Sequence, residues 1–539
     1  MNKLLTLTCC FLLITSVCFA DSIRKRAIFM PPLEGLNTSV SPLILNPKSI
    51  ISATNVLYDQ VGSRKKRGGL LYLNETSGTE TSGSNTVMGI FDFKKIDSLG
   101  GETRKILTHL DGKIFKIDSF DGTLDNISNR QLSIDKPADY AVLRKADTTT
   151  DSVIMVNGSE IPQVWDQDST TVSDLTGGPT DIDFYPSCIE THNFRLWAAG
   201  VPSYPYRVFF SAGFKHDDWN TAEDAGYIDV IDSIGSRVTG LAGNYYSYIV
   251  VFLEESIHII SGSTYTDYAV SPIITNMGAV NNAGIVPFGN DIFFVSSKGI
   301  HSLSTTQKYG DILETYLSAP IQESFNSLNK NRLKYCYGAV YPEKNYLIWS
   351  FTDGGQNTND TCFVYDYIGK RWSKWTGINA SSFAVVNNNS NSLELVAGNY
   401  DGFINRMNRR DYNDNGQAYT MSFQTPYISF DDSIISKSFK EFFIFLNPQG
   451  SSNMTVSYTI DNEDSELLTF SQEGFSGTLD SFILDVDTLD SGTLVPLSNN
   501  LTGTGKTIQL TFEQGDVDVG CEVYGYGLEF LVSDINYSN

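Results

Sequence analysis

The stretch Tyr248-Ile-Val-Val-Phe-Leu253-Glu-Glu-Ser-Ile257-His-Ile-Ile260 contains two short apolar runs joined by a polar turn at Glu254-Glu255. Val, Ile, Phe and Tyr are the residue types that suit a pleated, half-buried strand. Two such runs separated by a few polar residues predict a β-hairpin. This hairpin belongs to a series, and the series decides the fold class.

Six other segments repeat the same order of strand, turn and strand. Their turns lie at Asp111-Gly112, Asn157-Gly158, Pro202–Pro205, Lys298-Gly299, Gly369 and Asp401-Gly402. Between residues 112, 158, 205, 255, 299, 369 and 402 the spacings are 46, 47, 50, 44, 70 and 33, and the last two average near the others. A four-stranded propeller blade needs about 40 to 50 residues. Residues 87–411 are therefore predicted to form a β-propeller of about six to seven blades; β-sandwiches with accidental spacing are the alternative, because no repeat signature recurs cleanly.

The pattern of apolar and polar residues changes after Asp411, where regular alternation of the two begins. Segments such as Met454–Ile460 and Thr507–Phe512 alternate with the period of a strand that has one buried face. Residues 412–539 are therefore predicted to form a C-terminal β-sandwich, which makes the chain all-β. From Gln417 onward there are 18 acidic residues against three lysines and no arginine, within a chain of net charge −24. Such a surface repels phosphate and disfavours tight binding of nucleic acid.

The N-terminal residues divide into two parts. Residues 1–20 resemble a secretory signal, with Lys3, an apolar run from Leu4 to Phe19 and a plausible cleavage site before Asp21. Residues 21–86 are predicted to be an extended arm followed by a flexible polar loop, because prolines punctuate them and their periodicity is weak. Export to the periplasm or the medium is thus one predicted localisation.

No catalytic constellation is recognisable in the sequence. The five histidines do not pair at metal-ligand spacing, and there is no Cys-x-x-Cys, phosphate loop or nucleophile elbow. We therefore predict a protein that is not an enzyme, with no catalytic residue and no cofactor, although a carboxylate pair brought together by the fold stays open. Asp411, Asn413 and Asn415 resemble the start of a calcium loop, but Ser422 stands where a bidentate Glu is expected, and an Asx-rich interdomain turn is the alternative.

The run Arg64-Lys65-Lys66-Arg67 is unusual in so acidic a chain. One interpretation is a docking patch for a phosphate-bearing or acidic partner, and the other is a solvated run on the arm.

Several phrases of the sequence resemble phage tail-hub proteins, also called nozzle or packaged-DNA stabilisation proteins of short-tailed phages. The phrases are Pro32-Leu-Glu-Gly35-Leu36-Asn37, Ala53-Thr-Asn55-Val56, Gly62-Ser-Arg64-Lys-Lys-Arg67-Gly68-Gly69, Asp218-Trp219-Asn-Thr221-Ala222, Ala225-Gly226-Tyr-Ile228-Asp229-Val230 and Val238-Thr239-Gly240-Leu241. The resemblance extends from about residue 28 to the end and consists of phrases and their order, without an invariant chemical motif.

The resemblance implies a structural virion protein of the phage tail. Such proteins combine a propeller with a β-sandwich and assemble as a homo-oligomeric ring, usually of six copies, below the portal and adaptor. The ring retains packaged double-stranded DNA and conducts it during ejection without reading its sequence, and tail fibre or needle proteins are further partners. A secretory signal is out of place in a tail that assembles in the cytoplasm. An exported bacterial propeller that binds glycan or protein as an adhesin is therefore the alternative function.

Overall fold

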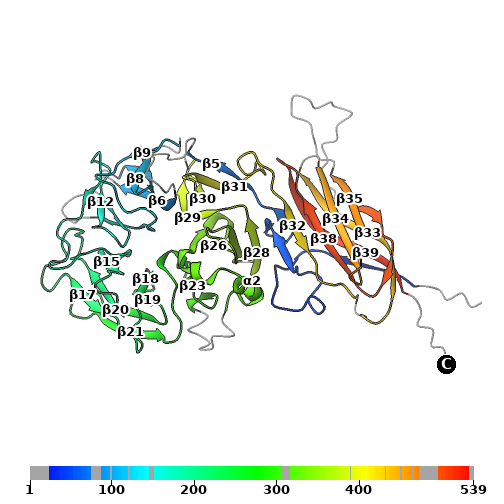
Figure 1. Cartoon of the computed structure of the whole chain (residues 1–539), viewed down its shortest axis with the longest axis horizontal. Helices are drawn as coiled ribbons and strands as arrows, with labels where there is room; N and C mark the ends of the chain where they lie inside the picture. The colour runs from blue at the N-terminus through cyan, green and yellow to red at the C-terminus, as the bar shows by residue number, and fades with distance from the viewer. Residues whose placement is uncertain are drawn as a thin grey trace, which may run out of the picture.

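The fold is taken from a computed structural model of the chain. It describes residues 23–74, 86–96, 100–118, 122–144, 151–304, 316–388, 390–430, 432–449, 452–463, 466–472 and 496–532. The signal-like residues 1–20 and most of the polar loop before residue 86 lie outside these ranges. Within them the chain forms a ring of small antiparallel sheets joined to a two-sheet sandwich (Figure 1), so the predicted all-β propeller and sandwich are confirmed. None of the described helices is both long and apolar enough to cross a membrane.

Seven blades make up the propeller in the described residues. The first four are β6–β9 (Val87–Ile96, Glu102–Leu110, Lys113–Ile117, Asp125–Asn126), β10–β13 (Asp139–Arg144, Asp151–Val156, Gln163–Trp165, Ser173–Asp174), β14–β17 (Cys188–His192, Arg195–Ala199, Arg207–Phe210, Gly226–Asp229) and β18–β21 (Val238–Tyr245, Tyr248–Leu253, Ile257–Ser261, Ala269–Ile274). The next two are β22–β24 (Val286–Phe288, Asp291–Val295, Ile300–Ser302) and β25–β28 (Tyr337–Tyr341, Tyr346–Phe351, Thr361–Asp366, Arg371–Thr376). Short helices join these two: η2 (Ala319–Ile321), α2 (Gln322–Asn326) and η3 (Lys330–Tyr335).

The seventh blade combines strands from distant parts of the chain. It contains β29 (Ala380–Asn387), β30 (Leu393–Asn399), β31 (Ile404–Arg409) and, on its outer edge, β5 (Gly69–Tyr72). The innermost strand β29 packs against β6 of the first blade, which closes the ring. The strand β5 thus fastens the N-terminal arm to the last blade, and radial closure leaves few free sheet edges.

Each predicted hairpin is present, and the structure explains the two irregular spacings. In six of the blades, the turn from which the spacing was measured joins the second and third strands. The turn between β19 and β20 is an example. In the sixth blade the turn at Gly369 joins the third and fourth strands, β27 and β28. Its second and third strands are instead joined by the longer polar loop between Phe351 and Thr361. Because the Gly369 turn lies one strand further out than the turns of the other blades, the spacing before it is long, at 70 residues, and the spacing after it is short, at 33.

The sandwich takes strands from both ends of the chain. One sheet has the order β3-β4-β39-β33-β36, with β1 on β39 and β37 on β33, and the other has the order β2-β32-β38-β34-β35. Its C-terminal strands are β32 (Met421–Gln424), β33 (Lys437–Gln449), β34 (Ser452–Ile460), β35 (Glu466–Gln472), β36 (Leu497–Asn500), β37 (Thr504–Gly505), β38 (Ile508–Gln514) and β39 (Gly520–Val532). The arm contributes β1 (Ile23–Phe29), β2 (Ser52–Thr54), β3 (Val56–Tyr58) and β4 (Arg64–Lys66). The expected arm is therefore built into both domains.

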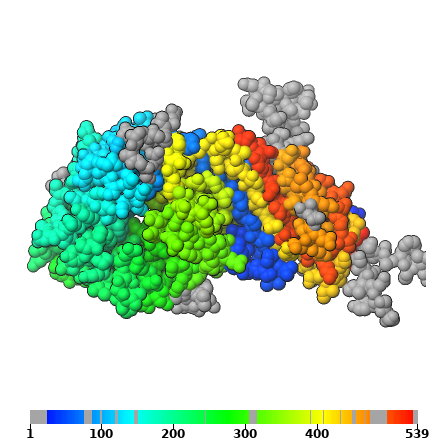
Figure 2. All heavy atoms as spheres, viewed as in Figure 1, coloured from blue at the N-terminus to red at the C-terminus, as the bar shows by residue number. Residues whose placement is uncertain are grey.

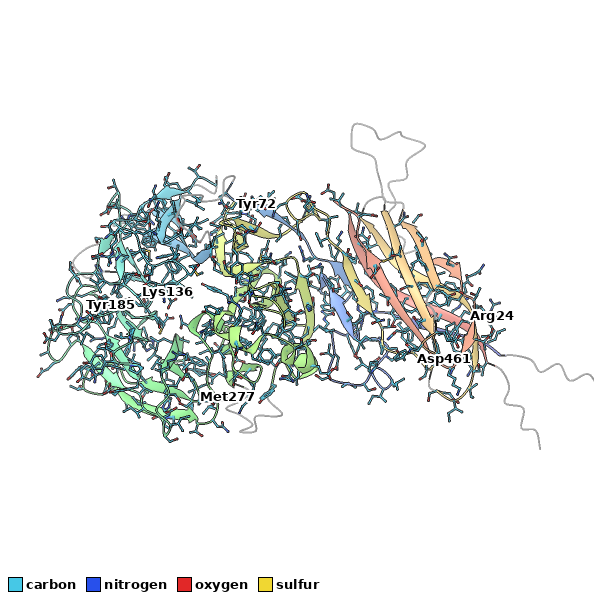
Figure 3. All side chains as sticks on the ribbon, viewed as in Figure 1. Arg24, Tyr72, Lys136, Tyr185, Met277 and Asp461 are labelled. Carbon is cyan, nitrogen blue, oxygen red and sulfur yellow. The ribbon has the colours of Figure 1, made fainter. Side chains whose placement is uncertain are left out.

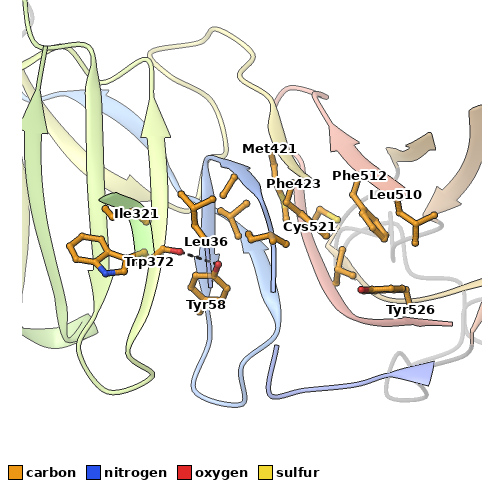
Figure 4. Packing of buried hydrophobic residues seen from close by; sticks show 14 of the residues in the cluster. Leu36, Tyr58, Ile321, Trp372, Met421, Phe423, Leu510, Phe512, Cys521 and Tyr526 are labelled. Carbon is orange, nitrogen blue, oxygen red and sulfur yellow. Dashed lines mark hydrogen bonds between the residues drawn. The ribbon is translucent and has the colours of Figure 1, made fainter. Parts of the chain in front are cut away.

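One apolar core crosses the boundary between the domains. It runs from Trp372 of the sixth blade through Tyr58 of the arm to Phe512 and Tyr526 of the sandwich (Figure 4). In Figure 2 the blue N-terminal residues fill the space between the green blades and the orange and red sandwich. Because buried side chains pack at crystal-like density, this shared core holds the propeller and the sandwich against each other.

Candidate functional site: a basic cleft between propeller and sandwich

A cleft of about 1560 Å³ lies where the arm meets the outer parts of blades six and seven. Its floor is the β3–β4 hairpin, in which Leu57 pairs with Lys65. Its walls are arm residues 29–37 and 46–49 on one side and the turns at 344–346, 366–372 and 409–412 on the other. Side chains of a strand alternate between its two faces, so in β4 Lys65 points into the cleft while its two neighbours point into the protein.

Three of the four residues of the predicted docking patch are buried and cannot contact a partner. Arg64, Lys66 and Arg67 are 0%, 0% and 1% exposed. The guanidinium of Arg64 lies between the two sheets of the sandwich, 4.9 Å from the centre of the Phe423 ring, and burial lowers its pKa. The prediction that these three residues dock a partner is therefore wrong. Of the basic run, only the half-buried Lys65 is placed to meet one.

The contacts of the Lys66 ammonium show how a basic residue of the run 64–67 is accommodated inside the protein. It donates to the backbone oxygen of Asp516 at 2.8 Å and lies 4.6 Å from the centre of the Tyr419 ring. Desolvation lowers the pKa of Lys66 to about 8. Long basic side chains bury their stems against apolar surface when the charged end finds acceptors, and the run uses this to join arm and sandwich.

The cleft has a surplus of positive charge in a strongly acidic protein. Eight Lys or Arg residues and three acidic residues line it, a formal surplus of five. The acidic residues are all engaged: Glu34 accepts from Asn46 at 2.7 Å, Asp59 accepts from the backbone N–H of Gly62 at 2.7 Å, and Asp366 pairs with Arg371 at 2.7 Å. Only Asp366 forms an ion pair with a cation of the cleft, and the three carboxylates together are too few to neutralise its eight cations.

Besides the buried Lys66, five cations of the cleft form no ion pair with any side chain that the structure describes. They are Lys48, Lys65, Lys344, Lys370 and Arg410. They come from the arm, the hairpin, two turns of blade six and the end of β31, so only the folded chain brings them together. Two exposed apolar side chains, Val61 and Ile368, also line the cleft, at 60% and 71% exposure. The combination suits an acidic segment that also carries apolar side chains.

The candidate calcium loop lies beside blade seven, and several polar atoms in it bond to the surrounding fold. Asp414 accepts two hydrogen bonds from Arg67, and the side-chain oxygen of Asn413 accepts from the backbone of Gly416 at 2.6 Å. Asn415 donates to Asn405 at 3.0 Å. In the described ranges no three acidic, His or Cys side chains are grouped to hold a metal. Asp411, Asn413 and Asn415 thus lie in an Asx-rich turn at the boundary between the domains, and calcium binding by them stays a prediction.

A second polar cluster lies at the centre of the propeller. Asp139 at the start of β10 accepts from the backbone N–H of Ile189 and from the side chain of Asn282, both at 2.8 Å. These bonds link blades two, three and five. Duplex DNA therefore cannot pass along the axis of the propeller, and a DNA channel would have to lie between copies of the chain.

Two carboxylates of this cluster are held in a poorly solvated position. Desolvation raises the pKa of Asp139 to about 6. Desolvation and then the charge of Asp139 raise the pKa of Glu190 to about 7. Sequence reasoning left such a pair open because β10 and β14 bring it together only in the fold. Each carboxylate accepts hydrogen bonds from neighbouring backbone groups, so both are fixed in place.

Glu190→Gln is expected to flatten the pH dependence of stability. The pKa of Glu190 is higher in the folded chain than its ordinary 4.5, so its contribution to stability is full below pH 4.5 and is lost as pH rises through about 7. At about 1.4 kcal/mol per pH unit the loss is at most about 3.5 kcal/mol, and the partial exposure of the side chain reduces it to about 1–2 kcal/mol. Urea unfolding at pH 5 and pH 8 measures it, with the exposed Glu255→Gln as control. Equal pH dependence in wild type and Glu190→Gln would contradict this assignment.

Comparison with known proteins gives little beyond the architecture. No family model and no curated protein matches the chain. The extracellular domain of a putative hybrid two component system from B. thetaiotaomicron is 9% identical, with a TM-score of 0.42 over 83% of this chain and 62% of that chain. The extracellular domain of a putative one component system from B. thetaiotaomicron is 10% identical, with a TM-score of 0.39 over 79% and 57%. YCF48 bound to D1 peptide is 10% identical, with a TM-score of 0.37 over 66% and 97%.

The chain spans about three fifths of the length of the two extracellular domains. With such low TM-scores, the fold assignment rests on the pairing of this chain's own strands.

Proposed function

We propose that this protein is a non-enzymatic binding and assembly module, and that it acts as a subunit of a ring-shaped tail hub in a short-tailed phage. The observation that carries the binding role is the cleft, where three exposed and two half-buried cations form no ion pair with a described side chain, in a protein of net charge −24. A positive cleft in an acidic protein attracts acidic segments and selects against other surfaces.

The assignment to a phage tail is supported by the sequence phrases that resemble tail-hub proteins. Several of these phrases have a structural role in the fold. Gly62 to Gly69 contains β4 and the buried basic run, and Ala53 to Val56 joins β2 to β3. These phrases fasten the arm, which is the part of the fold that unites the domains. A ring of such bodies would leave its channel between subunits, where acidic surfaces let DNA slide without adhering.

Electron microscopy of the full chain tests the proposal. Negative-stain images with and without portal protein are expected to show a ring, of six copies by the resemblance, with a central hole wide enough for duplex DNA. A protein that stays monomeric at high concentration with portal protein present would contradict the tail-hub proposal.

An exported propeller that binds glycan or protein is the second candidate, and the signal-like residues 1–20 favour it. Sequencing the N-terminus of native protein discriminates the two. Cleavage before Asp21, together with a monomer that binds glycans on an array, would move the assignment to this candidate. An uncleaved N-terminus in purified virions would exclude it.

A further inference from the structure

We propose that the basic cleft of one copy holds residues 473–495 of a neighbouring copy, so that successive subunits join head to tail. This inference rests on the proposed ring and names the partner of the cleft. A contact between two different surfaces of identical chains closes into a ring when the rotation between copies allows it.

The cleft needs negative charge from a partner, because its own carboxylates do not neutralise its cations. Lys344 and Lys370 are exposed at the mouth of the cleft, in the turns that bound blade six. Arg410 lies at the end of β31, and the half-buried Lys48 and Lys65 lie deeper. The exposed Val61 and Ile368 add apolar surface beside these charges. An occupant must therefore bring several carboxylates and apolar side chains on one short segment.

Residues 473–495 have that composition. The segment contains five acidic residues and no Lys, Arg or His. They are Glu473, Asp480, Asp485, Asp487 and Asp490. Between them runs Phe482-Ile-Leu484, which would meet the apolar part of the cleft. Apart from the buried Lys66, five cleft cations lack an ion pair among the described residues, and the segment brings five carboxylates.

The strands that flank the segment lie at the edges of the sandwich opposite the cleft of the same chain. The segment follows β35 and precedes β36, and these strands form the outer edges of the two sandwich sheets. The cleft lies at the opposite edges, beside β3 and β4, about 15–20 Å away at the spacing of neighbouring strands. A fully extended segment of 23 residues reaches about 40 Å out and back. This is enough to reach a second copy and also the cleft of its own chain, and the mixing experiment below distinguishes the two.

Two full-length variants test the contact from its two sides. The cleft variant is Lys344→Glu with Lys370→Glu, and the segment variant changes Glu473 to Gln and the four aspartates to Asn. The control is Lys136→Glu with Lys298→Glu, which has the same change in charge at two exposed propeller lysines. Lys136 lies within the propeller, between β9 and β10 (Figure 3), and neither lysine lines the cleft.

Mass photometry at a concentration where wild type forms rings gives the readout. Each variant alone is expected to be monomeric, and the control to form rings. An equimolar mixture of cleft and segment variants is expected to give dimers only, because one intact cleft meets one intact segment. Occupation within the same chain would give no dimers on mixing, and rings that persist in either variant would overturn the inference while leaving the tail-hub proposal intact.

A peptide experiment separates failure of the inference from failure of the proposed ring. A fluorescein-labelled peptide of residues 473–495 is titrated with wild type, the cleft variant and the control, and anisotropy is measured. The cleft variant is expected to bind at least tenfold more weakly than wild type, and a scrambled peptide of the same composition more weakly as well. If wild type forms no ring yet binds the peptide in this way, the ring proposal fails and the cleft assignment stands. Equal binding to all three proteins would overturn the cleft assignment.

Discussion

Arg67→Ala is expected to destabilise the folded protein by about 3–5 kcal/mol, because it breaks a buried ion pair at the domain junction. The guanidinium of Arg67 donates to both carboxylate oxygens of Asp414, at 2.9 and 2.5 Å. It also donates to Asn55 at 2.9 Å and to the backbone oxygen of Thr376 at 3.2 Å, and it lies 3.9 Å from the centre of the Tyr419 ring. Truncation leaves Asp414 without its counter-charge in a poorly solvated position.

Chemical denaturation monitored by tryptophan fluorescence measures the loss. Arg410→Ala is the matched control, since Arg410 is exposed, and it should change stability by less than about 0.5 kcal/mol. Arg67→Lys should fall between the two, because an ammonium cannot reproduce the paired donors of the guanidinium. A loss below about 1 kcal/mol for Arg67→Ala would show that the arm is held by other contacts.

Trp372→Ala is expected to cost about 3–5 kcal/mol, the range for removing a large buried aromatic side chain. Trp372 is 2% exposed, packs 4.8 Å from the Tyr365 ring centre and donates from its indole N–H to Leu317 at 2.9 Å. Its backbone oxygen accepts from Tyr58 of the arm at 3.2 Å (Figure 4). The cavity left by Ala would open the core shared by propeller and sandwich.

The same denaturation experiment measures the effect of Trp372→Ala. Ile368→Ala, in the preceding turn, is the control, because that side chain is 71% exposed and its loss should have little effect. Trp372→Phe keeps the ring but loses the hydrogen bond and should cost less than Ala. Equal stability of the Ala variant and wild type would show that the domains do not depend on this part of the core.

Local patterns in the sequence were enough to predict the propeller. The hairpins have partners a few residues apart, so their alternation and turn residues are visible in a short window. The arm was different, because β3 pairs with β4 but β2 pairs with β32 and β5 with β31, far along the chain. Three- or four-residue strands with distant partners leave almost no periodic signal.

The candidate site was less predictable than the fold. Charge runs are usually solvated, which made Arg64 and Arg67 look like surface residues. The apolar triplet Val56-Leu-Tyr58 just before the run was the available signal that this part of the arm is internal. Of the unpaired cleft cations, only Lys65 was singled out from the sequence. Lys344, Lys370 and Arg410 are isolated in the sequence and meet only when blade six and the arm fold together.

The fastening of β5 onto β31 has a consequence for how the protein is made. The ribosome produces β5 near the start and β31 only after the rest of the propeller, an interval on the order of tens of seconds at usual rates of translation. Throughout that interval β5 lacks the strand it will pair with, and blade one lacks its neighbour β29. Nascent chains with exposed strand edges are prone to aggregate. We therefore expect the yield of soluble protein to depend on chaperones and growth temperature during synthesis, even though the finished ring is closed.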